Sequence, residues 1–109
     1  MKSFRFIAMG VFAYGSFLLP AGAQSADPSA GRRIAETTCI ACHQIGPSAE
    51  PKVPKSGAPS FVDISRMPST NELAIKVFLR SSRAKMPNII LSSEEIDSIA
   101  AYIVGLAKK

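Results

Sequence analysis

Cys39-Ile40-Ala41-Cys42-His43 is a Cys-x-x-Cys-His pentapeptide that contains both cysteines of the chain and its single histidine. On a helical turn, two thiols at this offset face the same side, and the imidazole follows directly. This pattern is the attachment signature of a c-type haem, with thioether bonds from Cys39 and Cys42 and iron ligation by His43. The motif therefore predicts one covalently bound haem c, with its iron, per chain.

The first 23 residues have the composition of a secretory signal peptide. Lys2 and Arg5 give a positively charged start, residues 6–19 are apolar, and Ala21-Gly22-Ala23 matches an A-x-A cleavage site. An uncleaved membrane anchor is the alternative, but the apolar run is shorter than the roughly 20 residues that span a bilayer. We therefore expect this segment to be removed and the remaining protein to be periplasmic, without a stable membrane span.

Residues 24–109 then form a single small domain, which has too little chain to bury a large apolar core. A haem held by two thioethers would give it an apolar centre, whereas a disulfide between Cys39 and Cys42 would close too short a loop. The full chain carries a formal net charge of +5, of which two positive charges belong to the signal segment. The remaining charge gives little support for nucleic-acid binding.

Helices are the regular structure that the sequence predicts, because no alternating run of strand length is present. The first helix begins with Asp27 as N-cap and Pro28 in its first turn, and it runs into Cys39, where it delivers the haem motif. An irregular loop is expected over residues 44–57, which contain two glycines and three prolines. A short helical turn is expected over residues 60–66.

Two capping boxes predict the starts of the last two helices. In Ser69-Thr70-Asn71-Glu72 the serine would be the N-cap of a helix that ends by Ser82, and the apolar face of this helix comprises Leu73, Ala74, Val77 and Phe78. In Ser92-Ser93-Glu94-Glu95 the first serine would cap the last helix, whose apolar stripe comprises Ile96, Ile99, Ala100, Ile103 and Leu106. The expected fold class is all-α.

An exported domain with this motif at the end of its first helix, a Met-Pro pair in a late loop and a closing amphipathic helix resembles a small class I cytochrome c. The resemblance extends over about residues 27–107. It implies a small cytochrome c fold, in which the N- and C-terminal helices cross and the remaining segments enclose one haem. It also implies that Gly31 lets these two helices approach closely, in a pairing with Tyr102.

The resemblance further implies which residues complete the iron site. His43 is the proximal ligand, and in similar cytochromes a proline carbonyl of the following loop accepts its other ring N–H. Pro59 is the better match for this proline, and Pro47 is the second. Met86, in a loop just before the last helix, is the expected sixth ligand. Met67 is also followed by proline and is its rival.

The leading functional interpretation is an electron carrier rather than an enzyme. One electron would enter and leave through the haem edge, and a methionine opposite histidine would raise the reduction potential. Redox-partner proteins would dock through acidic faces, steered by a basic group that comprises Lys52, Lys55, Arg80, Arg83 and Lys85.

Three other functions are less consistent with the sequence. A haem enzyme or a gas-binding sensor requires an open or weakly bound sixth position, and the chain has no second histidine for a distal acid–base role. A thiol–disulfide redox pair is typical of a helix that follows a strand in an α/β fold, and that pattern is missing. A structural zinc site requires a second pair of ligands at finger spacing.

Overall fold

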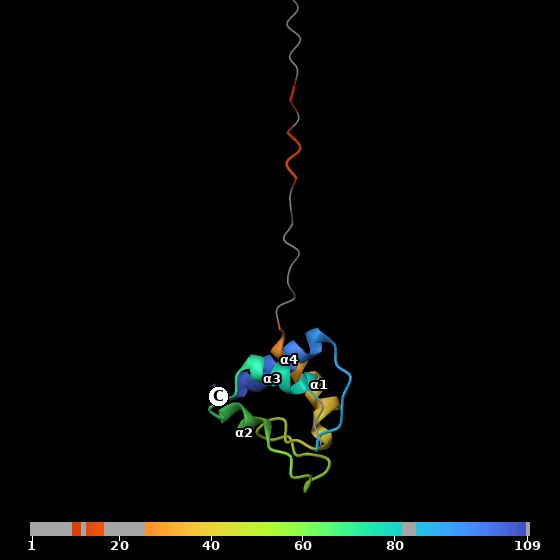
Figure 1. Ribbon diagram of the computed structural model, residues 1–109, viewed down its shortest axis with the longest axis vertical. Coiled ribbons are helices and arrows are strands. Elements are labelled where there is room, and N and C mark those ends of the chain that lie inside the picture. The colour runs from red at the N-terminus through yellow and green to blue at the C-terminus, as the bar shows by residue number, and fades with distance from the viewer. Residues whose placement is uncertain (1–9, 12, 17–25, 82–84, 109) are drawn as a thin grey trace, which may run out of the picture.

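Four α-helices and one 3₁₀ turn form the regular structure in the part of the chain that the computed structural model describes, namely residues 10, 11, 13–16, 26–81 and 85–108. In chain order they are α1 (Pro28–Thr37), the 3₁₀ turn η1 (Cys39–Ala41), α2 (Phe61–Arg66), α3 (Glu72–Arg80) and α4 (Ser93–Leu106). These residues contain no β-strand (Figure 1), and the prediction of an all-α domain is confirmed.

The segment predicted to be a signal peptide lies mostly outside the described residues, including its cleavage site at residues 21–23. Residues 10, 11 and 13–16 belong to neither a helix nor a strand. Among the helices that the structure describes, none is long and apolar enough to cross a membrane. Cleavage of residues 1–23 therefore stays a prediction.

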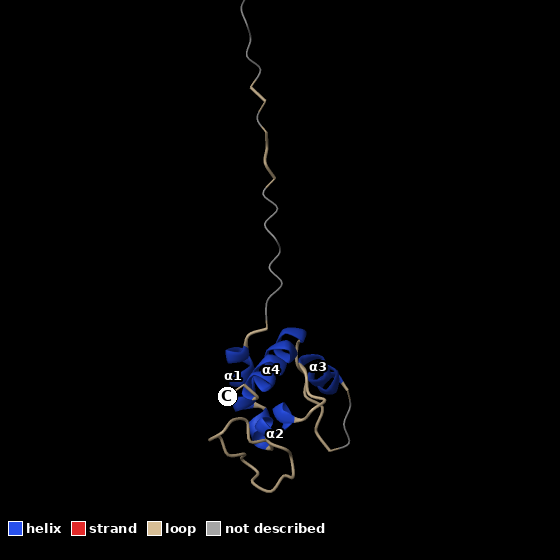
Figure 2. Cartoon of the chain, turned by 90° about the vertical axis from the view of Figure 1, so that its left-hand side faces the viewer, coloured by secondary structure: helices blue, strands red, loops and turns tan. Residues whose placement is uncertain are grey.

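The last helix, α4, is the centre of the domain. Within the described residues α1, α2 and α3 each contact α4, and none of the three contacts another (Figure 2). The capping box at its start is present as predicted: Ser92 Oγ accepts from Glu95 N, and Glu95 Oε2 accepts from Ser92 N. The whole predicted apolar stripe of α4 is buried, with Ile99 only 1% exposed.

The helices α1 and α4 cross in close contact at Gly31. A Cβ atom added to Gly31 would lie 2.9 Å from Ile99 N and still closer to Ser98 O, so only glycine permits this approach. The predicted crossing of the terminal helices is confirmed, and the atoms nearest to the added Cβ belong to Ser98 and Ile99. The pairing of Gly31 with Tyr102 stays a prediction. Tyr102 lies one turn further along α4, and its hydroxyl donates to Ile45 O at 2.7 Å.

The first helix starts as predicted and ends two residues earlier than predicted. Asp27 caps it by accepting from Ser29 N at 2.9 Å, and Pro28 occupies its first turn. It ends at Thr37, whose hydroxyl donates to Ile34 O at 3.0 Å, a side-chain bond that competes with helical geometry. The tighter turn η1 then carries the first three residues of the Cys-x-x-Cys-His motif.

The helix α3 begins later than its predicted capping box. Its N-cap is Asn71, whose Oδ1 accepts from Ala74 N at 2.8 Å, and not Ser69. Thr70 N donates to Met67 O, so the preceding residues form a separate turn that postpones the helix. Asparagine caps a helix as well as serine does, which makes the two starts hard to separate by pattern alone.

The predicted apolar face of α3 is not the face that packs on α4. Ile75 is the buried residue of α3, while Leu73 and Val77, on the predicted face, are 70% and 54% exposed. On the packed side Lys76 Nζ lies 3.2 Å from a carboxylate oxygen of Asp97 in α4. Within the described residues, the face of α3 that carries Leu73 and Val77 is therefore left exposed.

Candidate functional site

The two cysteines lie where α1 gives way to the turn η1. Cys39 is buried, Cys42 is half-buried, and both are free thiols. Burial raises the pKa of the Cys39 thiol to about 11, so this thiol is protonated at neutral pH. Thiol–disulfide catalysts have lowered thiol pKa values instead. The raised pKa of the Cys39 thiol therefore gives no support to a thiol–disulfide catalyst.

His43 has a defined tautomer. Its Nδ1 lies 2.7 Å from Pro59 O, and since a carbonyl oxygen can only accept, Nδ1 carries the proton and donates. With the proton on Nδ1, Nε2 is the ring nitrogen whose lone pair can bind a metal ion. The contact expected of Pro59 is thus present, whereas Pro47 O accepts from the Gln44 side chain at 3.4 Å.

Hydrogen bonds tie each residue from Ile40 to His43 to the loop that follows the motif. The bonds run from Lys52 N to Ile40 O (2.9 Å), from Val53 N to Ala41 O (3.0 Å), from Ser56 Oγ to Cys42 O (2.5 Å) and from His43 Nδ1 to Pro59 O. The loop is irregular, as predicted, but it is not independent of the site. It holds the backbone of the motif in one position.

Aromatic rings connect His43 to the centre of the domain. The ring of Phe61, only 4% exposed, lies 5.3 Å from the His43 ring between centroids, at 47°. The centroid of the Phe61 ring also lies 6.4 Å from that of the Tyr102 ring, and the two ring planes make an angle of 62°. Ser60 caps α2 by accepting from Asp63 N, which places Phe61 at the first helical position. The sequence predicted the helical turn here but not this ring contact, although an aromatic residue two positions after Pro59 is a usable signal.

Met86 is half-buried on the wall of a cavity of about 170 Å³. The cavity lies between the C-terminal end of α3 and the loop before α4, and its apolar lining includes Phe78, Leu79, Ile89 and Leu91. Met67, at the C-terminal end of α2, is 45% exposed and does not line this cavity. Arg80, Ser81 and Asn88 add polar groups to the lining. Of the two methionines, Met86 is therefore the one that lies beside a cavity.

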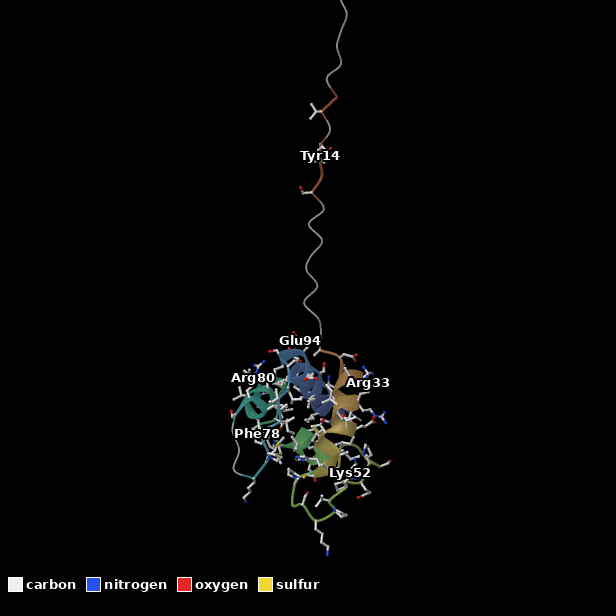
Figure 3. The ribbon with its side chains drawn as sticks, turned by 90° about the vertical axis from the view of Figure 1, so that its right-hand side faces the viewer. Tyr14, Arg33, Lys52, Phe78, Arg80 and Glu94 are labelled. Carbon is white, nitrogen blue, oxygen red and sulfur yellow. The ribbon has the colours of Figure 1, made fainter. Side chains whose placement is uncertain are left out.

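The predicted basic group does not gather in one place. Lys52, Lys55, Arg80 and Lys85 are exposed, while Arg83 lies outside the described residues. Figure 3 shows Lys52 lying well apart from Arg80, and Glu94 at the opposite end of the domain from Lys52. Lys52 and Arg80 therefore do not belong to one patch.

The arrangement of donors is consistent with a covalently held haem. Two free thiols stand four and one residues before a histidine whose Nε2 is available, and the motif backbone is fixed by the loop. Apolar side chains of α3 remain exposed, and a cavity with a mixed polar and apolar lining adjoins Met86. Cys39, Cys42 and His43 would hold the group, and the exposed apolar side chains of α3 are suited to cover it.

Comparison with family models gives one match, to the model described as cytochrome c oxidase, cbb3-type, subunit III. It extends over residues 26–103, from the start of α1 to the penultimate turn of α4, and includes the whole motif as well as Pro59 and Met86. Comparisons with curated proteins and with solved structures found no match.

Proposed function

Because the chain belongs to the family described as cytochrome c oxidase, cbb3-type, subunit III, we propose that it carries single electrons in the periplasm through one haem c whose iron is bound by His43 and Met86. Members of this family are class I c-type cytochrome domains with covalently attached haem c, and Cys39-Ile40-Ala41-Cys42-His43 is consistent with that attachment. The chain is accordingly a small monohaem cytochrome c domain, and the family supports a haem-based electron carrier.

The observation that carries the proposal is the hydrogen bond from His43 Nδ1 to Pro59 O. It fixes the tautomer in which Nε2 is unprotonated, and it orients the ring through a loop that is itself bonded to the motif. An acceptor on the second ring nitrogen also makes the imidazole a better electron donor to a metal. Haem c supplies a one-electron centre, and His43 holds and tunes it.

We assign the sixth position to Met86. Met86 lines a cavity beside the end of α3, and Pro87 favours an extended backbone at Met86, which stiffens the loop. A thioether opposite an imidazole favours the ferrous state and suits a carrier that cycles between two oxidation states. An iron held by both His43 and Met86 would have no position left for a substrate.

The location and the partners follow from the same proposal. Residues 1–23 act as a cleaved signal, and residues 24–109 work in the periplasm as the monohaem domain. Redox-partner proteins with acidic faces dock near the haem edge, attracted by exposed residues such as Lys85 and Arg80. Because these charges are solvent-exposed, partner association is expected to weaken with rising ionic strength.

Visible and near-infrared spectra of the purified protein test this function directly. The full chain, expressed in a host with haem c attachment machinery, should give the sharp reduced bands of a six-coordinate low-spin haem c. Its oxidised form should show the near-infrared band of methionine-bound ferric haem. A high-spin oxidised spectrum, together with rapid carbon monoxide binding to the reduced protein, would show an open sixth position and reject the carrier with two protein ligands.

A further inference from the structure

Three hydrogen bonds form a closed ring that joins His43 to the loop supplying its acceptor. His43 Nδ1 donates to Pro59 O at 2.7 Å, Ala58 N donates to Ser56 Oγ at 3.2 Å, and Ser56 Oγ donates to Cys42 O at 2.5 Å. Cys42 directly precedes His43, and Ala58 directly precedes Pro59. The Ser56 hydroxyl therefore connects the two backbone segments on one side of the His43–Pro59 bond. On the other side Phe61 N donates to Gln44 O at 2.9 Å, so the hydroxyl contributes one of two further links between the segments.

The turn that closes this ring depends on Gly57. Its φ of +76° lies in the left-handed region that favours glycine. This conformation lets the chain reverse between Ser56 and Ala58, so that the Ala58 amide points back to the Ser56 hydroxyl. The next residue is Pro59, whose ring fixes its own φ. Few torsions are then left free between the hydroxyl and the Pro59 carbonyl.

Ser56 has no packing role that would explain its place in the ring. The residue is exposed, so removal of its hydroxyl opens no cavity in the core. What the hydroxyl contributes is the pair of bonds to Cys42 O and from Ala58 N. Its effect must therefore pass through the relative placement of the two segments.

We propose that Ser56 is a positioning residue for His43. The Ser56 hydroxyl sets the strength of the bond from His43 Nδ1 to Pro59 O and thereby tunes the reduction potential of the iron. The inference rests on the proposed function, because only a metal at His43 Nε2 would respond to it. A strong bond at Nδ1 makes the imidazole more electron-donating, and this stabilises the more positively charged ferric state. Loss of the Ser56 hydroxyl should weaken that bond and raise the reduction potential.

The test compares three variants of the haem-loaded full chain. Ser56→Ala removes the hydroxyl, and Ser56→Thr retains one. Asn71→Ala is the matched control, because Asn71 is an exposed N-cap of α3 that destabilises the fold when lost but has no bond to the ring. The readouts are the reduction potential, from spectroelectrochemical titration, and the hydrogen-exchange rate of the His43 Nδ1 proton, from NMR of the reduced protein.

For Ser56→Ala we expect the ratio of oxidised to reduced protein at a fixed applied potential to fall about threefold. This effect is smaller than the roughly 10- to 100-fold loss of metal affinity or activity that follows removal of a group bonded directly to a ligand, because Ser56 acts through the Pro59 segment. Exchange of the His43 Nδ1 proton should become faster. Ser56→Thr should match the unchanged protein in both readouts. Asn71→Ala should lower the unfolding midpoint and leave both readouts as they were.

Two results would overturn the role of Ser56. One is a Ser56→Ala protein with unchanged potential and unchanged exchange, and the other is an Asn71→Ala protein that shifts both as much as Ser56→Ala does. A failure of the proposed function is distinguishable from these, because the unchanged protein would then lack the haem c spectrum or its six-coordinate form.

Discussion

Gly31 in α1 lies directly against the backbone carbonyl of Ser98 in α4, at a distance that leaves no room for a Cβ atom. The atom in the way belongs to the backbone of a buried helix, so it cannot move aside as the end of a flexible side chain can. The Ser98 hydroxyl also accepts from Asp27 N at 3.3 Å, just before α1 begins. The start of α1 is thus fixed to the first half of α4 by a close contact and a hydrogen bond.

Gly31→Ala should therefore destabilise the protein although alanine is the better helix former. Forcing the two helices apart costs about 1–3 kcal/mol, which outweighs a gain in helix propensity of about 1 kcal/mol. Gly105→Ala is the control, because Gly105 lies in α4 with nothing within 4 Å of an added Cβ. It should leave stability unchanged or raise it. Guanidinium unfolding measures both, and equal stability of the two variants would contradict the close contact.

Changing both Cys39 and Cys42 to alanine should give a chain without covalent haem that is largely unfolded. The physical reason is the loss of the apolar centre around which α1, α3 and the loops are expected to pack. Far-ultraviolet circular dichroism measures the folded fraction of the variant. For the unchanged protein, acidic acetone should leave the haem on the polypeptide, and a colourless polypeptide after extraction would refute thioether attachment.

Met86→Ala should abolish the near-infrared band of the oxidised protein, lower its reduction potential and open the iron to carbon monoxide or cyanide. These changes follow if the thioether beside the cavity is the sixth ligand. Met67→Ala is the matched control, since Met67 is also followed by proline but lies at the exposed end of α2. Loss of the band in Met67→Ala, with retention in Met86→Ala, would exchange the two assignments.

Tyr102→Phe should cost about 1 kcal/mol near neutral pH through loss of the bond to Ile45 O. Burial raises the pKa of Tyr102, with Arg32 lowering it and Glu36 raising it. The pKa of Tyr102 is therefore higher in the folded than in the unfolded protein. Its hydroxyl contributes fully to the free energy of unfolding below pH of about 10, and this contribution is lost as the pH rises through the folded pKa.

Urea unfolding of both proteins near neutral pH and again above pH of about 10 checks the sign of this dependence. The stability gap between the tyrosine and phenylalanine proteins should shrink at the higher pH. A gap that stays constant or widens would mean that the Tyr102 proton is not held by the folded state.

The exported protein should begin at Gln24, since Ala21-Gly22-Ala23 is the cleavage site that the sequence predicts. Intact-mass spectrometry of the protein from the periplasmic fraction measures this start directly, with the mass of one haem added to residues 24–109. A mass that includes residues 1–23, found with the membrane fraction, would instead indicate an anchored carrier.

Local signals in the sequence predicted some elements well because each signal is satisfied within a few residues. The capping box at Ser92 and the apolar stripe of α4 depend only on helical periodicity, and both are present. The late start of α3 shows the limit of this reasoning. Ser69 and Asn71 are both good caps, and the turn from Met67 to Thr70 decides between them.

Contacts between distant segments were harder to predict. The resemblance implied the close approach at Gly31 but did not name Ser98 and Ile99 as the nearest residues of α4, because the crossing point depends on how the two helices pack rather than on either sequence. The exposed face of α3, at Leu73 and Val77, was predicted as the apolar face and is apolar. The sequence pattern did not predict that α3 buries Ile75 on another side and leaves the face with Leu73 and Val77 exposed.

The central place of α4 also sets the order in which the chain can acquire its tertiary structure. A polypeptide is synthesised from its N-terminus, and α1, α2 and α3 contact no helix except α4 in the described part of the chain. None of the three has a helical partner until the final segment has emerged, and the closing of α1 on α4 must span most of the domain. In the exported chain, Cys39 and Cys42 are therefore available for covalent attachment before α4 packs against α1. The connectivity of the fold places attachment at the motif ahead of the last packing step.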